Sequence, residues 1–216
     1  MIPVQQAAAL LLTIAFVLGP NWVFAADKPV KIVVLGDSLS AGYGLNVQDA
    51  FPSKLDVALK AKGHAVEMIN AGVSGDTSTG GLGRVDWSVP ADANAVILEL
   101  GANDALRGVN PDVTRDALDQ ILVKLKARKI PVLLAGMKSP PNMGPDYVAK
   151  FDAIFPDLAK AHDALLYPFF LEGVAANDKL NQRDGIHPNA EGVDVIVKSI
   201  LPKVEELIAL AKARTG

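Results

Sequence analysis

VKIVVL, residues 30–35, is followed without a break by GDSLS, residues 36–40. Apart from Lys31, the first six residues are β-branched or apolar, which is typical of a strand that is buried on both faces of a parallel sheet. The next five are small or polar, and they start where such a strand should end. Because ligands bind outside the carboxyl ends of the strands in parallel α/β sheets, this stretch predicts both the fold class and the position of a site.

Short β-branched runs alternate with helical patterns along the rest of the chain, which indicates repeated strand–helix–strand units. Four further strands are predicted at residues 65–69, 95–100, 130–135 and 164–167. Helices are predicted at residues 51–62, from about 110, at 146–160 and from about 189. Pro202 is expected to kink or divide the last helix. The predicted class is α/β, a three-layer α/β/α flavodoxin-like sandwich with a five-stranded parallel sheet and right-handed connections.

The N-terminal segment has the pattern of an export signal. No charged residue precedes Asp27, and the apolar stretch Ala7 to Leu18 is shorter than the ~18 residues that a membrane-spanning helix needs. We expect a signal peptide at residues 1–25 that is cleaved after Ala25, and one domain at residues 26–216. The product would be periplasmic or secreted, without a stable membrane anchor. Since the first six residues contain no Lys or Arg, an uncleaved anchor is the alternative.

The composition excludes several classes of function. Half of the 216 residues are hydrophobic, so the chain can bury one substantial core. The formal net charge is −3 and the basic residues are scattered among acids, which argues against nucleic acid as a partner. The absence of cysteine removes disulfides, thiolate metal sites and cysteine nucleophiles. A metallohydrolase is disfavoured because neither His-x-His nor His-Glu-x-x-His spacing occurs.

Four loops that follow predicted strands carry the residue types of a serine hydrolase. They are residues 36–40, 71–76, 101–104 and the longer loop that leads to residues 184–188. An ester hydrolase needs a nucleophile, a base, a group that orients the base, and hydrogen-bond donors for the developing oxyanion. Each of these has a candidate in the four loops.

His187 is the candidate base among the three histidines. His64 lies at the start of the second strand and His162 near the end of a helix, where solvated structural roles are expected. Asp184, three residues before His187, can hold the imidazole Nδ1 proton and fix the tautomer. Alone, this pair could also be a helix N-cap followed by a surface histidine.

Ser38 is the candidate nucleophile because it lies just past a buried strand, where its own N–H can also donate to an oxyanion. Gly75 can offer a backbone N–H and Asn103 a side-chain amide from the neighbouring loops. Each has an alternative role, since serine caps helices and both glycine and asparagine are common in turns. The nearby acids are expected mainly to make loop hydrogen bonds: Asp37, Asp76, Glu99 and Asp104.

These blocks resemble the GDSL, or SGNH, hydrolase family over the whole chain after the predicted signal peptide. The matching blocks are GDSL at 36–39, Gly75, GAND at 101–104 and DGIHP at 184–188. The segments SGDTS at 74–78, GGL at 80–82 and LRG at 106–108 are similar to the bacterial thioesterase I, lysophospholipase and arylesterase group. Two segments depart from that group: Ala102 stands where a second glycine is common, and residues 84–90 differ.

The resemblance implies a serine esterase in which Ser38 is acylated and His187 and Asp184 complete a triad. It further implies that the Ser38 N–H, Gly75 and Asn103 form the oxyanion hole, and that neither metal nor cofactor takes part. The implied substrates are small acyl esters, acyl thioesters and lysophospholipids. We expect the enzyme to be a monomer.

An apolar groove formed by the strand-end loops around Ser38 is expected to hold the acyl chain. Its predicted residues are Leu106, Pro140, Pro141, Met143, Val174 and Leu180. Long acyl chains would then be favoured over acetyl.

Two other functions fit the same fold. A carbohydrate O-acetyl esterase would use aromatic platforms, and the sequence offers two tryptophans, of which Trp22 lies in the export segment and Trp87 in the domain. A periplasmic binding module without catalysis would require the serine, the histidine and the oxyanion donors to coincide by chance.

Overall fold

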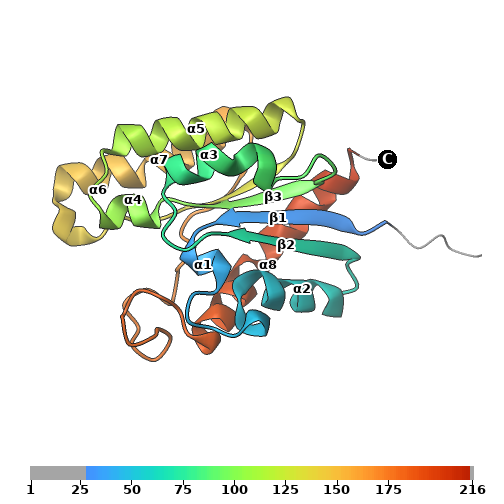
Figure 1. The fold of residues 1–216 in the computed structure, drawn as a ribbon, viewed down its shortest axis with the longest axis horizontal. Helices are drawn as coiled ribbons and strands as arrows, with labels where there is room; N and C mark the ends of the chain where they lie inside the picture. The colour runs from blue at the N-terminus through green and yellow to red at the C-terminus, as the bar shows by residue number, and fades with distance from the viewer. Residues whose placement is uncertain (1–27, 215–216) are drawn as a thin grey trace, which may run out of the picture.

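The computed structural model describes residues 28–214, so the predicted export segment and its cleavage site lie outside the described residues. Its centre is a five-stranded, all-parallel sheet with the order β2-β1-β3-β4-β5 (Figure 1). The strands are β1 (Val30–Gly36), β2 (Val66–Gly72), β3 (Ala95–Glu99), β4 (Val132–Ala135) and β5 (Leu165–Tyr167). The strand order reverses between β1 and β3, and such a switch point is where α/β sheets bind ligands.

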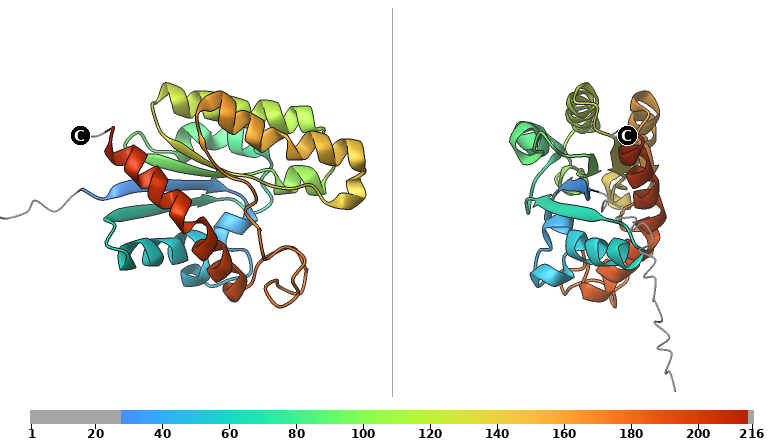
Figure 2. Two further views of the ribbon diagram at one scale, coloured as in Figure 1. Left: turned by 180° about the vertical axis from the view of Figure 1, so that it is seen from behind. Right: turned by 90° about the vertical axis from the view of Figure 1, so that its right-hand side faces the viewer.

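Helices cover both faces of the sheet, which accounts for the apolar strands. On one face lie α3 (Ser78–Ser88), α5 (Pro111–Ala127) and α7 (Ile154–His162), and on the other lie α2 (Phe51–Ala61) and α8 (Ala190–Lys212) (Figures 1 and 2). The central strand β3 is buried at every position. A strand with helices on both sides has no solvent-facing side, so its sequence is continuously apolar rather than alternating.

Short elements complete the chain at the ends of the strands. They are α1 (Ser38–Ala41), α4 (Ala102–Leu106), α6 (Pro145–Asp152) and the 3-10 helices η1 (Val47–Asp49) and η2 (Pro141–Met143). Helices α1, α4 and α6 and η2 follow β1, β3 and β4, so the carboxyl end of the sheet carries most of the irregular chain. No helix within residues 28–214 combines the length and the apolar character that crossing a membrane requires.

The predicted α/β/α sandwich is confirmed, and one helix prediction is wrong. Residues 146–160 form two helices, α6 and α7, which are separated at Ala153. The break precedes Pro156, which has no N–H to donate to the carbonyl of Asp152 and fits best in the first turn of a helix. Pro202 does not divide α8, because Pro202 and Lys198 both lie on its exposed face, where water can satisfy the carbonyl that the proline leaves free.

Candidate active site

Ser38 is the first residue of α1, directly after the end of β1. Asp37 caps this helix, because its Oδ1 accepts a hydrogen bond from the Leu39 N–H at 3.0 Å. Gly42 ends the helix in the left-handed conformation, with φ 82°. One short turn therefore fixes the Ser38 side chain at the switch point of the sheet, where it is 8% exposed.

A continuous chain of hydrogen bonds joins Ser38, His187 and Asp184. Ser38 Oγ lies 2.9 Å from His187 Nε2, and His187 Nδ1 lies 2.7 Å from Asp184 Oδ2. Asp184 Oδ1 also accepts hydrogen bonds from the N–H groups of Ile186 and His187, each at 3.0 Å. The structure thus brings together three residues that the sequence places up to 149 positions apart.

The loop that carries His187 is fixed to the rest of the site by Gln182. Its N–H donates to the carbonyl of His187 at 2.7 Å, and its Nε2 donates to the carbonyls of Tyr43 at 2.7 Å and Pro188 at 3.0 Å. The Tyr43 ring packs on the imidazole with 4.6 Å between the ring centroids. The segment after α1 and the histidine loop therefore support each other, and no sequence motif predicts this role for Tyr43 or Gln182.

Asp184 and Asp37, the carboxyl groups on either side of the Ser38–His187 pair, have opposite pKa shifts. The hydrogen bond with the His187 side chain, followed by that with its backbone N–H, lowers the pKa of Asp184 to about 2. Burial raises the pKa of Asp37 to about 6, against the opposing effect of its hydrogen bonds with Leu39 and Asn103. Asp184 is thus a carboxylate at any pH where the protein would be used, so it can act as the permanent acceptor for the imidazole.

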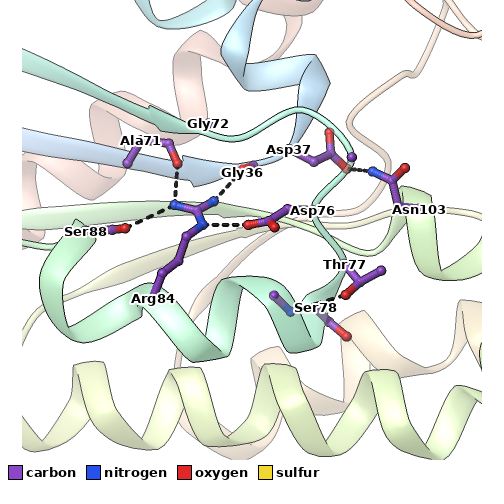
Figure 3. A network of polar contacts seen from close by, with 12 residues as sticks. Gly36, Asp37, Ala71, Gly72, Asp76, Thr77, Ser78, Arg84, Ser88 and Asn103 are labelled. Atoms are coloured by element: carbon purple, nitrogen blue, oxygen red, sulfur yellow. Dashed lines mark hydrogen bonds and ion pairs between the residues drawn. The ribbon is translucent and has the colours of Figure 1, made fainter.

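Asn103 and Gly75 lie on the two strand-end loops beside Ser38. Asn103 is carried by α4, and its Nδ2 donates to Asp37 Oδ2 at 3.1 Å (Figure 3). An amide nitrogen has two N–H groups, so this bond orients the amide and leaves one donor free. Gly75 has φ 85°, a conformation that favours glycine, and its carbonyl accepts from Arg107 Nη2 at 2.9 Å. Ala102 stands where similar sequences often have a second glycine, and Asn103 still lies on α4 beside it.

A mainly apolar cavity of about 320 Å³ opens beside Ser38 and His187. Of the predicted groove residues, Leu106, Pro140 and Pro141 line it. The prediction is wrong for Met143, Val174 and Leu180, which do not. Val174 is fully buried in the core and Leu180 packs against that core, while Met143 lies against Gly108. Further apolar lining residues that the sequence did not indicate are Leu39, Ala102, Ala105, Met137, Phe169, Leu171, Ala175, Ala176 and Ile186.

Arg84 on α3 holds the ends of β1 and β2 together (Figure 3). Its Nη2 donates to the carbonyl of Gly36 at 2.8 Å, its Nη1 to the carbonyl of Ala71 at 2.7 Å, and its Nε to Asp76 Oδ2 at 2.5 Å. The side chain is almost completely buried. This residue lies in the segment where the sequence departs from its nearest group, and its part in the site was not foreseen.

The other acids make structural hydrogen bonds as expected, whereas the two remaining histidines, which were expected to be solvated, are partly buried beside acidic partners. Asp104 accepts from Ser78 and Thr114, Glu99 accepts from Ser40, and Asp76 pairs with Arg84. His64 contacts Glu205 at 2.9 Å and His162 contacts Asp119 at 2.6 Å. Within residues 28–214, no group of three or more His, Cys, Asp or Glu side chains is arranged to hold a metal ion.

The fold and the hydrogen-bonded Ser-His-Asp arrangement define an ester-bond hydrolase of the α/β class. Residues 34–195 match the model of the GDSL-like Lipase/Acylhydrolase family, and the chain belongs to this family. The chain is 38% identical to "Thioesterase 1/protease 1/lysophospholipase L1" of Escherichia coli K12, over 86% of this chain and 88% of that protein. It is 39% identical to "Arylesterase" of Vibrio mimicus, over 77% of this chain and 84% of that protein.

Solved structures agree with this assignment. The crystal structure of AlinE4, an SGNH-hydrolase family esterase, is similar with a TM-score of 0.72 and 45% sequence identity. The match covers 84% of this chain and 98% of AlinE4. The fold and the family predicted from the sequence are therefore confirmed.

Proposed function

We propose that this protein is an exported serine esterase that hydrolyses carboxylic esters and acyl thioesters through an acyl-Ser38 intermediate. The observation that carries the proposal is the unbroken hydrogen-bond chain from Ser38 Oγ through His187 to Asp184, at 2.9 and 2.7 Å, next to an apolar cavity. A nucleophile, a base and an orienting acid at such distances are what acyl transfer requires.

In the acylation step, Ser38 Oγ attacks the substrate carbonyl while His187 Nε2 takes the hydroxyl proton. The negative charge that develops on the carbonyl oxygen is stabilised by the N–H of Ser38, the N–H of Gly75 and the free amide N–H of Asn103. Collapse of the tetrahedral intermediate breaks the bond to the leaving alcohol or thiol, which receives its proton from His187. Asp184 stabilises the imidazolium and stays ionised throughout.

In the deacylation step, His187 takes a proton from water as the water attacks the acyl carbonyl. The second tetrahedral intermediate uses the same oxyanion donors. Its collapse releases the carboxylic acid and returns the proton to Ser38. The cycle needs no group besides those of the chain and water.

The apolar cavity supports acyl chains longer than acetyl as substrates. Its walls come from α1, α4, the loop after β4 and the loop between β5 and α8, and most of the lining side chains are aliphatic. The names of the relatives, which include a thioesterase, a lysophospholipase and an arylesterase, support a broad range of leaving groups. Carbohydrate esters are less well supported, because the cavity offers few aromatic rings on which a sugar could stack. Phe169 is the one Phe, Tyr or Trp among the lining residues, and the exposed Trp87 lies outside the cavity.

A panel of p-nitrophenyl esters from acetate to palmitate, together with acyl-CoA thioesters, tests this proposal. We expect wild-type turnover to rise with chain length from acetate, and Ser38→Ala and His187→Ala to lose at least three orders of magnitude in kcat on every substrate. Hydrolysis by Ser38→Ala at the wild-type rate would contradict the acyl-serine mechanism. Fastest turnover on acetate, falling steadily with chain length, would contradict the acyl cavity.

Export and monomeric state are part of the same proposal. The pattern of residues 1–25 supports cleavage after Ala25, so N-terminal sequencing of the protein from the periplasmic fraction should begin at Ala26. Light scattering of that material should give the mass of one chain. A full-length protein retained in the membrane fraction would instead support the uncleaved anchor.

A further inference from the structure

Glu99, the last residue of β3, is a fully buried carboxyl group directly beneath the turn that carries Ser38. Its Oε2 accepts hydrogen bonds from the Ser40 hydroxyl at 2.6 Å and from the Asp37 N–H at 3.3 Å. These two residues lie on either side of Ser38 and Leu39, so Glu99 is hydrogen-bonded to both ends of the turn. The catalytic steps proposed above do not use this group.

The second oxygen of Glu99 is unusual. Oε1 is buried and has no hydrogen-bond partner within residues 28–214. Across the same residues, the ion pairs include none to Glu99. An ionised carboxylate in such a position would leave a charged oxygen unsolvated, which costs several kcal/mol, whereas a proton on Oε1 leaves only a neutral hydroxyl unpaired.

The charged groups around Glu99 reinforce this conclusion. Its nearest ionisable neighbour is Asp37, a second buried acid whose charge acts against that of Glu99. Asp37 is in turn influenced by His187 and by Asp104. Arg84, the one buried Lys or Arg within residues 28–214, directs its guanidinium to Asp76, Ser88 and the carbonyls of Gly36 and Ala71 (Figure 3). Burial first, and the Asp37 charge second, raise the pKa of Glu99 well above its usual range.

We propose that Glu99 is a positioning residue that supports the Ser38 turn as a neutral carboxylic acid. Its carbonyl oxygen, Oε2, accepts from Asp37 and Ser40 and so fixes the orientation of the Ser38 hydroxyl toward His187. Its proton is held on Oε1, inside the core. This inference rests on the proposed role of Ser38 as nucleophile, but the protonation state of Glu99 can be measured independently of activity.

Two substitutions distinguish the role of Glu99 as a hydrogen-bond acceptor from its protonation state. Glu99→Gln matches the neutral acid in shape and keeps the accepting oxygen, so we expect kcat within about threefold of wild type. Glu99→Leu removes the acceptor and leaves two buried donors unpaired, so we expect kcat to fall at least tenfold while KM stays within about threefold. An equal loss of kcat in Glu99→Gln and Glu99→Leu would overturn the neutral form of Glu99. Wild-type kcat in Glu99→Leu would overturn its positioning role.

An infrared difference spectrum provides the measurement that does not depend on turnover or on the folding of the leucine variant. At pH 8 the wild type minus Glu99→Gln spectrum should contain the carbonyl stretch of one protonated carboxylic acid, which shifts on transfer to D2O. Asp37 is ionised at that pH and should not contribute. A carboxylate band in its place would overturn the proposal. If the wild type itself shows no Ser38-dependent hydrolysis, the proposed function fails, while the spectrum still reports on Glu99.

Discussion

At the residue scale, the site depends on polar groups that have more than one role. Asn103 uses one amide N–H to bind Asp37 and has a second one free, while its Oδ1 lies 3.5 Å from Arg107 Nη2. Asp37 caps α1 and orients Asn103 at the same time. Removal of either side chain should therefore impair the proposed oxyanion donors without removing the proposed nucleophile, Ser38.

Substitution of Asn103 by alanine should lower kcat by about two to three orders of magnitude, with a small change in KM, because an oxyanion donor acts mainly in the transition state. Steady-state kinetics on a p-nitrophenyl ester gives both constants. Asn46→Ala is the matched control, since within residues 28–214 the Asn46 side chain makes only a long 3.4 Å contact, with Asp49 at the surface. Wild-type kcat in Asn103→Ala would remove this residue from the oxyanion hole.

The pKa of Asp37, about 6 in the folded protein, predicts a dependence of stability on pH. The folded state binds this proton more tightly than the unfolded chain, where the pKa is about 3.9, so the Asp37 contribution makes the protein less stable as pH rises from about 4 to 6. Asp184 has the opposite sign, since its pKa of about 2 adds stability above pH 4 that is lost as pH falls toward 2.

Urea denaturation of the wild type and Asp37→Asn between pH 4 and 7 tests this assignment. The free energy of unfolding of wild type relative to the variant should decrease across that range and become constant above it. A difference that is flat from pH 4 to 7 would show that Asp37 titrates normally. In the same window kcat should also fall toward low pH, because a protonated Asp37 cannot accept as well from Asn103.

The sequence predicts that Ser38, His187 and Asp184 share one site, and in the structure their side chains are hydrogen-bonded to one another, because strand-end loops of a parallel sheet meet at one edge. The sequence did not predict the contacts of Tyr43 and Gln182 with the histidine loop, nor the protonation state of Glu99. Their roles depend on which side chains face one another across 60 to 140 residues of chain, and neither residue type nor spacing carries that information.

At the scale of elements, α3 joins the strands to the site through Arg84. Residues 78–88 contain Gly80, Gly81 and Gly83, and such a composition disfavours a helix, so α3 was not predicted. Thr77 caps it through the Gly80 N–H, and a Cβ on Gly81 would collide with Leu100. Tertiary packing thus overrides local preference, and Gly81 allows α3 to lie close against Leu100 at the end of β3, on the helix from which Arg84 reaches the strand ends.

Substitution of Arg84 by alanine should destabilise the protein by on the order of 3 kcal/mol, because it leaves Asp76 and two strand-end carbonyls without their partner. Arg84→Lys keeps the charge but cannot reproduce the forked contacts, so it should fall between wild type and alanine. Chemical denaturation measures both, with the surface variant Arg115→Ala as control. Equal stability of Arg84→Ala and Arg115→Ala would show that the network contributes little.

The cavity depends on loops from separate elements, which explains why half of its predicted residues were wrong. Ala175 is an exposed lining residue, so Ala175→Phe should narrow the cavity and shift the preferred ester toward shorter chains. Turnover of the acetate ester should stay within about twofold of wild type. Ala149→Phe, on the exposed side of α6, is the control. An unchanged chain-length profile in Ala175→Phe would place the acyl chain elsewhere.

At the scale of the whole molecule, the parallel sheet makes the site possible. The order β2-β1-β3-β4-β5 places the ends of β1, β2 and β3 side by side, so Ser38, Gly75 and Asn103 come from three adjacent loops. His187 and Asp184 lie on the loop before α8. Helix α8 packs across the sheet on the face opposite α3 and α5 (Figure 2). The apolar runs in the sequence are sufficient to predict this architecture, because continuous burial of strands requires helices on both faces.

The most direct test of the central claim is covalent labelling by a fluorophosphonate, with the modified residue located by mass spectrometry. The wild type should carry one label per chain, on Ser38, and labelling should be lost in Ser38→Ala and slowed at least a hundredfold in His187→Ala. Labelling of another serine, or equal labelling of wild type and Ser38→Ala, would contradict the assignment of Ser38 as the nucleophile.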